Sequence, residues 1–317
     1  MVLFNAYPGI YGARLVLPKD LFNFEILPNP SLLNEMPKKN ILFTATQYAS
    51  KGGALPLDMT LRAELALEFF QKARQLGYDV VCVDGRSDGG WVSEVRDLGV
   101  KVETENFTDI LGKHPMGKSR RQALNFALNC GKHPLVTWCE PEKHPYILSP
   151  DGRNPISMAA TPVYEGLADL TAPRRVDNLE SYPTTQQLAE VECNLLATNL
   201  LRMHASSRGM PQVPYLDHCS GPRTFHRDQA HYFTEYSGEI RGKEYDRWGS
   251  LLVPVWNMLI DGKKVCGVAV PYVHPIRQTE FEAGSPSYDA KRLEQALAFK
   301  QALDDLIESK KRCATTA

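Results

Sequence analysis

The stretch GKHPMGKSRRQALNFALNCGKHPLVTWCEPEKHPY, from Gly112 to Tyr146, decides the fold. It predicts three features in succession: an amphipathic helix with a basic start, a buried strand and an acidic turn. The helix has an apolar side and ends at Cys130-Gly131. That apolar side is formed by Leu124, Phe126, Ala127 and Leu128. Leu135 to Trp138 is too short for a helix and suits a buried strand, which Glu140-Pro141-Glu142 follows.

The charged residues of this stretch predict a ligand site. Lys118, Arg120 and Arg121 stand at the start of the helix, where backbone amides would also face an anion. Open α/β sheets bind their ligands at the carboxyl ends of the strands. Glu140 and Glu142 lie at such an end, with the cations one helix earlier. The arrangement predicts a site for a metal-bound phosphate.

The chain before this stretch predicts a parallel sheet. Residues 1–39 are rich in Pro and Asn, so we expect an extended lead-in. Strands are predicted at Asn40–Thr46, at Tyr78–Val83 and near Val100–Glu103, with amphipathic helices between them. Strand–helix alternation with short glycine turns is typical of a mostly parallel sheet covered by helices on both faces, an α/β three-layer sandwich.

The second half is less regular. Pro145–Pro173 is expected to be rich in loops, and Tyr215–Arg223 to be a turn-rich functional loop. Helices are expected at Thr184–Met203 and from Asp289 to about Lys311. The turn after the apolar segment that ends at Ile260 leads into a further strand, Lys264–Val270.

Composition limits the classes of function. The 317 residues carry 36 Lys plus Arg against 37 Asp plus Glu, a formal net charge of −1, which argues against a general nucleic-acid binder. No apolar run approaches the roughly 20 residues that span a bilayer. The first residues lack the basic and apolar blocks of a signal peptide. The 7 cysteines contain no C-x-x-C pair, so we expect reduced thiols and a cytoplasmic protein.

Several familiar catalytic motifs are missing from the sequence. Lys51-Gly52-Gly53 is not a phosphate-binding P-loop, because no Gly-Lys-Ser/Thr follows at the required spacing. The G-x-G-x-x-G of dinucleotide-binding oxidoreductases is also missing, as are the G-x-S-x-G nucleophile elbow and the H-E-x-x-H metalloprotease helix.

Three segments and one histidine together resemble a known family. The segments are VVCVDGRSDGG from Val80, GKSRRQALNFAL from Gly117 and WCEPEK from Trp138, and His274 follows a predicted strand. In this order they resemble the nucleotide-diphospho-sugar transferase (GT-A) fold of glycosyltransferases. The resemblance covers roughly Asn40 to His274.

The resemblance implies roles for particular residues. It places Asp84 at the nucleotide and Lys118, with Arg120 or Arg121, at the diphosphate. Glu140-Pro141-Glu142 stands where the family has its Asp-x-Asp metal motif, and His274 where several such enzymes supply a further ligand. Glutamate oxygens also bind Mn²⁺ or Mg²⁺. Because Pro141 stiffens the turn, one direct glutamate ligand is expected rather than two.

Other candidates come from the residues around these motifs. Thr44 and Thr46, on the first strand, are expected to contact substrate, and the Trp248 ring could stack on a sugar. Asp217 and Asp246 are the candidate catalytic bases, since an inverting transfer needs a carboxylate to take the proton of the acceptor hydroxyl.

The resemblance implies a metal-assisted glycosyltransferase that moves a sugar from a nucleoside-diphosphate sugar to a small-molecule or glycan acceptor. Residues 40–317 would form one domain, with a nucleotide-binding half at 40–145, an acceptor half at 146–288 and a C-terminal helix at 289–317. A homo-oligomer is compatible with this organisation. Two alternatives remain open: a nucleotidyltransferase on a related sheet, and a non-catalytic sugar-nucleotide-binding protein.

Overall fold

The protein forms a mostly parallel α/β sheet. The computed structural model describes residues 28–48, 57–107, 116–176, 179–207, 209 and 213–315. Seven strands of this described part form one sheet in the order β3-β2-β1-β4-β6-β5-β9. They are β1 (Asn40–Thr46), β2 (Asp79–Asp84), β3 (Lys101–Thr104), β4 (Leu135–Trp138), β5 (Leu170–Arg175), β6 (Arg223–His226) and β9 (Val265–Val270). Of these seven, β6 alone runs antiparallel, to both β4 and β5.

The strand order reverses at β1, and this reversal positions the site. From β1 the chain builds β2 and β3 on one side, then returns to place β4 on the other. In the register Thr46 pairs with Asp84, and Phe43 pairs with Trp138. The carboxyl ends of β1, β2 and β4 therefore meet at one edge. A crevice outside such a reversal is where open α/β sheets bind ligands.

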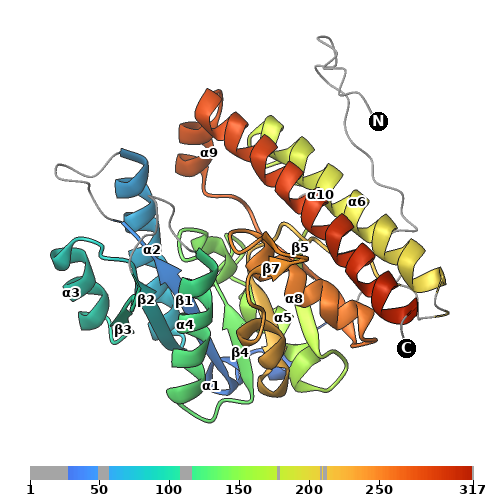
Figure 1. The fold of residues 1–317 in the computed structure, drawn as a ribbon. Coiled ribbons are helices and arrows are strands. Elements are labelled where there is room, and N and C mark those ends of the chain that lie inside the picture. The colour runs from blue at the N-terminus through green and yellow to red at the C-terminus, as the bar shows by residue number, and fades with distance from the viewer. Residues whose placement is uncertain are drawn as a thin grey trace.

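Helices cover both faces of the sheet, which confirms the predicted three-layer arrangement (Figure 1). In chain order they are α1 (Met36–Lys39), α2 (Leu57–Gln75), α3 (Gly89–Asp97), α4 (Met116–Asn129), α5 (Pro155–Tyr164), α6 (Thr184–Ser207), α7 (His231–Thr234), α8 (Gly249–Ile260), α9 (Ile276–Glu282) and α10 (Pro286–Thr315). The long helices α6 and α10 pack side by side (Figure 1). A small hairpin, β7 (Glu239–Ile240) and β8 (Lys243–Glu244), precedes α8.

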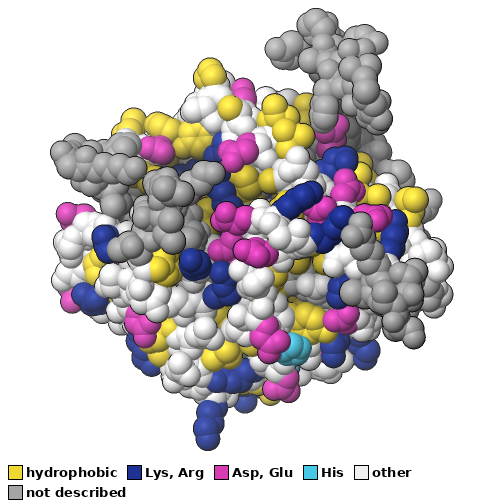
Figure 2. Space-filling model, in the orientation of Figure 1, with side chains coloured by type: hydrophobic (Ala, Val, Ile, Leu, Met, Phe, Trp, Pro, Cys, Tyr) yellow, Lys and Arg dark blue, Asp and Glu magenta, His cyan; other side chains and the backbone are white. Residues whose placement is uncertain are grey.

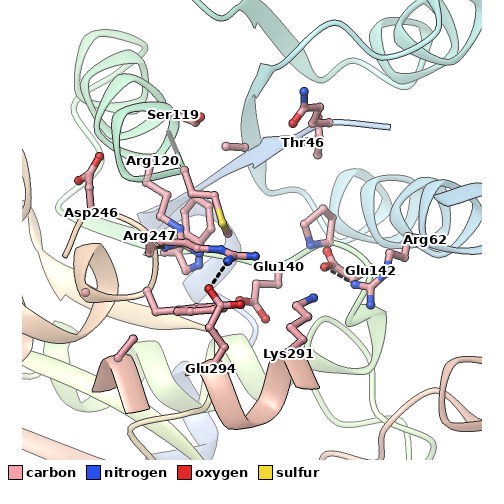
Figure 3. Close-up of a pocket in the computed structure, with 18 of the residues that line it drawn as sticks. Thr46, Arg62, Ser119, Arg120, Glu140, Glu142, Asp246, Arg247, Lys291 and Glu294 are labelled. Carbon is pink, nitrogen blue, oxygen red and sulfur yellow. Dashed lines mark hydrogen bonds and ion pairs between the residues drawn. The ribbon is translucent and has the colours of Figure 1, made fainter. Parts of the chain in front are cut away.

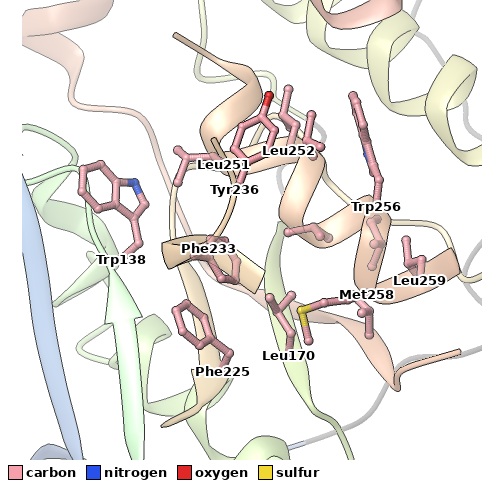
Figure 4. Packing of buried hydrophobic residues seen from close by; sticks show 14 of the residues in the cluster. Trp138, Leu170, Phe225, Phe233, Tyr236, Leu251, Leu252, Trp256, Met258 and Leu259 are labelled. Atoms are coloured by element: carbon pink, nitrogen blue, oxygen red, sulfur yellow. The ribbon is translucent and has the colours of Figure 1, made fainter. Parts of the chain in front are cut away.

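Alternating strand residues feed two apolar cores, one on each face. Along β1, Ile41 and Phe43 join the core that α4, α6, α8 and α10 cover, whereas Leu42 joins the core beneath α2 and α3. In the first core, the rings of Phe225 and Phe233 stack with their centroids 4.4 Å apart (Figure 4). This alternation follows from the two-residue period of a strand.

The structure corrects the expectation for Pro145–Pro173, which is not mostly loop. It contains α5 and the first part of β5, and β6 begins at Arg223, where a loop was predicted. The sequence hid α5 because nearly all of its side chains are buried, which leaves no helical period to read. It hid β5 because LTAPRR contains a proline and two arginines.

The start of the chain is partly described. Residues 28–39 of the expected lead-in include a 3₁₀ turn at Pro30–Leu32 and α1, whose Met36 is fully buried. Residues 1–27 lie outside the described part, as do residues 49–56, which include Lys51-Gly52-Gly53.

Two further properties of the described structure concern its helices and its surface charge. Among the described residues, no helix is both long and apolar enough to span a membrane. Basic and acidic side chains are interspersed over the face seen in Figure 2, as a nearly neutral composition predicts.

Replacing Trp256 tests how firmly α10 is docked on the sheet. The buried Trp256 ring on α8 packs edge-on against Phe299 of α10 at 5.1 Å, and its indole nitrogen donates to His218. We expect Trp256→Ala to lower the free energy of unfolding by about 3–5 kcal/mol, measured by urea denaturation. Leu293→Ala, at an exposed position of α10, should change it by less than about 0.5 kcal/mol. Equal effects of the two variants would contradict this packing account.

Candidate functional site

A pocket of about 740 Å³ opens at the carboxyl ends of β1 and β4 (Figure 3). Its walls come from the end of β1, from α2, α4 and α10, from the turn after β4 and from residues 244–249 before α8. This size is typical of a pocket for a small molecule or cofactor. The pocket therefore lies where the strand order reverses, at the edge that the sequence predicted.

The pocket brings six of the predicted site residues together. They are Thr46, Arg120, Glu140, Glu142, Asp246 and Trp248. The other six do not line it, and they are Thr44, Asp84, Lys118, Arg121, Asp217 and His274. The following contacts show which of these side chains are already bound to other residues and which can bind a ligand.

Glu140 forms a close ion pair at the floor of the pocket. Its carboxylate oxygen lies 2.5 Å from Nζ of Lys143, one turn later in the chain. Burial raises the pKa of Glu140, but Lys143 and Arg120 outweigh it and hold that pKa at about 2. A Cβ atom at Gly221 would overlap this carboxylate, so a glycine at that position leaves room for it. Glu140 is therefore ionised and already paired.

Glu142 is paired as well, with a cation from a different helix. Nη1 of Arg62, on α2, lies 3.2 Å from the Glu142 carboxylate. Nη2 of the same guanidinium lies 2.5 Å from Glu282 of α9. Burial opposes the charge of Arg62, but these two carboxylates outweigh it and raise the Arg62 pKa. Arg62 thus ties α2, α9 and the turn after β4 together beside the pocket.

Arg120 reaches the pocket from α4, and no carboxylate of the described residues pairs with it. Its Nη1 donates to the backbone oxygen of Arg247 at 2.6 Å and to Oγ of Ser250 at 2.7 Å. Its guanidinium lies over the Trp138 ring, 5.2 Å from the centroid. Burial lowers the Arg120 pKa to about 10, and Glu140 and Asp246 only partly offset that effect. The guanidinium is charged at neutral pH and, among the described residues, only neutral groups hydrogen-bond to it.

Arg121 faces another direction and binds Asp246. Its two terminal nitrogens donate to the two carboxylate oxygens at 2.5 and 3.1 Å, a bidentate pair. Glycines give this pair space: a Cβ at Gly117 would overlap Asp246, and one at Gly238 would lie 2.6 Å from its oxygen. Asp246 lines the pocket but is held by this guanidinium, which fastens α4 to the segment before α8.

Asp84 and Thr44 lie behind the pocket wall, and Thr46 lies between Asp84 and the pocket. The Asp84 carboxylate accepts hydrogen bonds from Oγ1 of Thr46 at 2.9 Å and from the backbone N–H of Ser87 at 2.7 Å. It therefore orients Thr46, which does line the pocket. The Thr44 side chain is buried in the sheet, and Lys118 is exposed on α4.

Asp217, a candidate base, belongs to a buried ionic network away from the pocket. Arg175 donates to its two oxygens at 2.6 and 2.7 Å, and Asn194 donates at 3.0 Å. The same guanidinium contacts Glu190 of α6 at 2.7 Å. Burial raises the Asp217 pKa, but Arg175 outweighs it and lowers that pKa. The network joins the end of β5 to α6.

His274 lies outside the pocket in cationic surroundings. It is buried, its Nδ1 pairs with Oγ1 of Thr279 at 2.8 Å, and its ring lies against Tyr182. Burial, then Lys143, Arg175, Arg292 and Arg62, lower the His274 pKa to about 2. The structure does not bring this imidazole together with the two glutamates.

The donor set as a whole does not fit a divalent metal. Glu140 and Glu142 each contact a cation, and the imidazole of His274 pairs with Thr279 and packs against Tyr182. Within the described residues, no three His, Cys, Asp or Glu side chains form a group that could hold a metal ion.

The sequence reasoning missed the residues that distant elements contribute. Lys291 and Glu294 project from α10, and Arg247 precedes α8 (Figure 3). Arg247 pairs with Glu294 at 3.0 Å and lies over the Trp248 ring. Lys291 forms no ion pair with any described residue. Only Lys143 had a local signal, because it lies three residues after Glu140.

Two cations of the pocket therefore have no carboxylate partner in the described part of the chain, namely Arg120 and Lys291. By contrast, four carboxylates that line the pocket are paired with cations: Glu140 with Lys143, Glu142 with Arg62, Asp246 with Arg121 and Glu294 with Arg247. Asp58, which accepts a hydrogen bond from Tyr288, and Glu244 line the pocket as well. An anion is the ligand that would complete this arrangement.

Removing Lys143 tests the ion pair at the floor. Lys143→Met leaves Glu140 charged and unpaired, so we expect the free energy of unfolding to fall by about 3–5 kcal/mol in urea denaturation. Pairing lowers the Glu140 pKa from 4.5 to about 2. The ion pair therefore contributes to the free energy of unfolding above pH 4.5, and this contribution is lost as the pH falls through 2. The control is Lys143→Met/Glu140→Gln, which should recover part of the loss. A double variant no more stable than the single one would refute the pairing account.

Comparison with known proteins supports the fold. No family model matches the sequence, and no curated protein matches it. Glucosyl-3-phosphoglycerate synthase from Mycobacterium tuberculosis, in complex with Mn²⁺, UDP-glucose and phosphoglyceric acid, matches at a TM-score of 0.50. The identity is 12%, over 91% of this chain and 86% of that one. The same enzyme with phosphoglyceric acid alone gives 0.49, at 12% identity over 87% and 82%. This chain has the GT-A fold of the nucleotide-diphospho-sugar transferases.

Proposed function

We propose that this protein is a glycosyltransferase that moves a sugar from a nucleoside-diphosphate sugar to an acceptor. One observation carries the proposal: in a GT-A fold, the pocket at the β1–β4 reversal contains two cations that lack a carboxylate partner among the described residues, Arg120 and Lys291. A diphosphate has the charge to bind both of them. Glucosyl-3-phosphoglycerate synthase, which shares the fold, was solved with UDP-glucose and Mn²⁺.

The elements around the pocket suggest how the donor would lie. The nucleoside would face the ends of β1 and β2, where Thr46 is oriented by Asp84. The diphosphate would contact Arg120 at the start of α4. The sugar would then lie toward the turn after β4 and residues 244–249, near Trp248. The acceptor would enter from the α10 side.

The transfer itself balances in a simple way. The acceptor hydroxyl oxygen forms a bond to C1 of the sugar as the bond from C1 to the diphosphate oxygen breaks. The diphosphate leaves with the electron pair, and the hydroxyl proton ends on the released nucleoside diphosphate. Arg120 would stabilise the charge that develops on the leaving group, an effect that fixed cations provide in a site of restricted solvent access.

Donor binding in this pocket is the first prediction to check. We expect one member of a panel of UDP-, GDP-, ADP- and TDP-sugars, each with Mn²⁺, Mg²⁺ or EDTA, to raise the melting temperature. A ligand at about 100 times its dissociation constant adds about 2.7 kcal/mol to the free energy of unfolding. Arg120→Met should abolish most of the shift, whereas Lys300→Met, on the exposed side of α10, should retain it.

The same panel separates the alternatives. Release of the nucleoside diphosphate in the presence of an acceptor mixture would support transfer. Stabilisation without turnover would favour a non-catalytic binder, and preference for a free triphosphate with pyrophosphate release would favour a nucleotidyltransferase. No stabilisation by any nucleotide sugar would contradict the proposed function.

A further inference from the structure

The carboxylates expected to bind a metal are already neutralised by the protein's own cations. Lys143 contacts Glu140 at 2.5 Å, and Arg62 contacts Glu142 at 3.2 Å. Arg62 cannot move away freely, because the almost fully buried Glu282 holds its other nitrogen. A divalent ion at these glutamates would have to displace both cations or sit beside them. Either arrangement is electrostatically costly in a site of restricted solvent access.

The two cations that form no ion pair with a described carboxylate are placed to replace the ion. Arg120 reaches into the pocket from α4 and Lys291 from α10, on opposite walls (Figure 3). The guanidinium of Arg120 is fixed by two hydrogen bonds through Nη1, and its other two nitrogens form no hydrogen bond with a described residue. A guanidinium binds phosphate bidentately and a lysine acts as a point charge, so the two cations together match the two negative charges of a diphosphate.

We propose that Arg120 and Lys291 neutralise the diphosphate of the donor and that this chain needs no divalent metal for it. The inference rests on the proposed function and deepens it. Glu140 and Glu142 then serve a different purpose, because they hold Lys143 and Arg62 in place around the floor of the pocket. Where the family has a metal-binding Asp-x-Asp, the Glu-Pro-Glu of this chain thus binds the side-chain cations of Lys143 and Arg62 instead of a metal ion.

Variants of the two cations test their shared role. In EDTA, we expect Arg120→Met and Lys291→Met each to weaken binding of the preferred nucleoside diphosphate at least about tenfold by calorimetry. Binding of the matching nucleoside, which has no phosphate, should change less than about twofold, which distinguishes a charge effect from a loss of fold. Lys300→Met is the matched control on α10. Equal losses for nucleoside and diphosphate would overturn the assignment.

A variant of the acidic turn gives opposite results under the two explanations. Glu142→Gln releases one side of Arg62, while Glu282 keeps the guanidinium in position. If the cations neutralise the diphosphate, its affinity in EDTA should rise, because Arg62 has more charge to offer. If a metal at Glu142 did so, the affinity measured with Mn²⁺ should fall, which would overturn the inference.

The pH dependence should identify Lys291. This lysine faces Arg62 of α2, Arg292 of its own helix, Glu282 of α9, Glu142 after β4 and the Tyr288 ring. Burial, then Arg62 and Arg292, lower the Lys291 pKa to about 8, while burial raises the Tyr288 pKa. Only protonated Lys291 attracts the diphosphate, so affinity in EDTA should decline as pH rises through 8. Lys291→Arg should remove the decline. If the affinity of the native protein did not decline as pH rises through 8, this role of Lys291 would be refuted.

Metal dependence is the deciding experiment. Binding of UDP, GDP, ADP and TDP to the native protein is measured by calorimetry in EDTA and again in Mn²⁺ or Mg²⁺. A preferred diphosphate that loses less than about tenfold in affinity in EDTA supports the inference. A larger loss overturns it and leaves the proposed function standing. No binding in either medium defeats the proposed function itself, so the two failures are distinguishable.

Discussion

The ion pair between Glu140 and Lys143 is the interaction on which the site depends. It places a permanent negative charge at the end of β4 and neutralises it at once, so the floor of the pocket is polar but electrically balanced. Gly221 leaves room for the carboxylate, and the turn through Pro141 keeps the lysine one helical turn away. With the floor balanced, the charge that a ligand meets is set by the walls, where α4 and α10 each contribute a cation.

A second pair fixes the geometry of those walls. Arg121 and Asp246 join α4 to the segment before α8 through two parallel hydrogen bonds, in a space that Gly117 and Gly238 keep open. Adjacent residues on α4 thus have different roles, since Arg121 holds the wall and Arg120 lines the pocket. Because a helix turns about 100° per residue, neighbouring side chains necessarily diverge in this way.

Local patterns in the sequence predicted the sheet, its parallel strands and the edge that carries the pocket. They also brought Glu140, Glu142 and Arg120 to one place, because strand ends and helix starts are short-range features. The sequence could not show that Arg62, Lys291 and Arg247 complete the site, since these lie on elements far apart in the chain. Burial also hid features from it: α5 is buried on all sides, and the sequence did not show that a buried arginine binds the candidate base Asp217.

The position of Lys291 has a consequence for biosynthesis. Most of the pocket is encoded by residue 249, yet α10, further along the chain, supplies one of the two cations that lack a carboxylate partner among the described residues. The same helix carries Phe299, which packs against Trp256 in the core. A nascent chain therefore completes this core and the proposed anion site in the same step, when α10 docks. Under the proposed function, the protein cannot engage a diphosphate through both cations until α10 has emerged from the ribosome and docked.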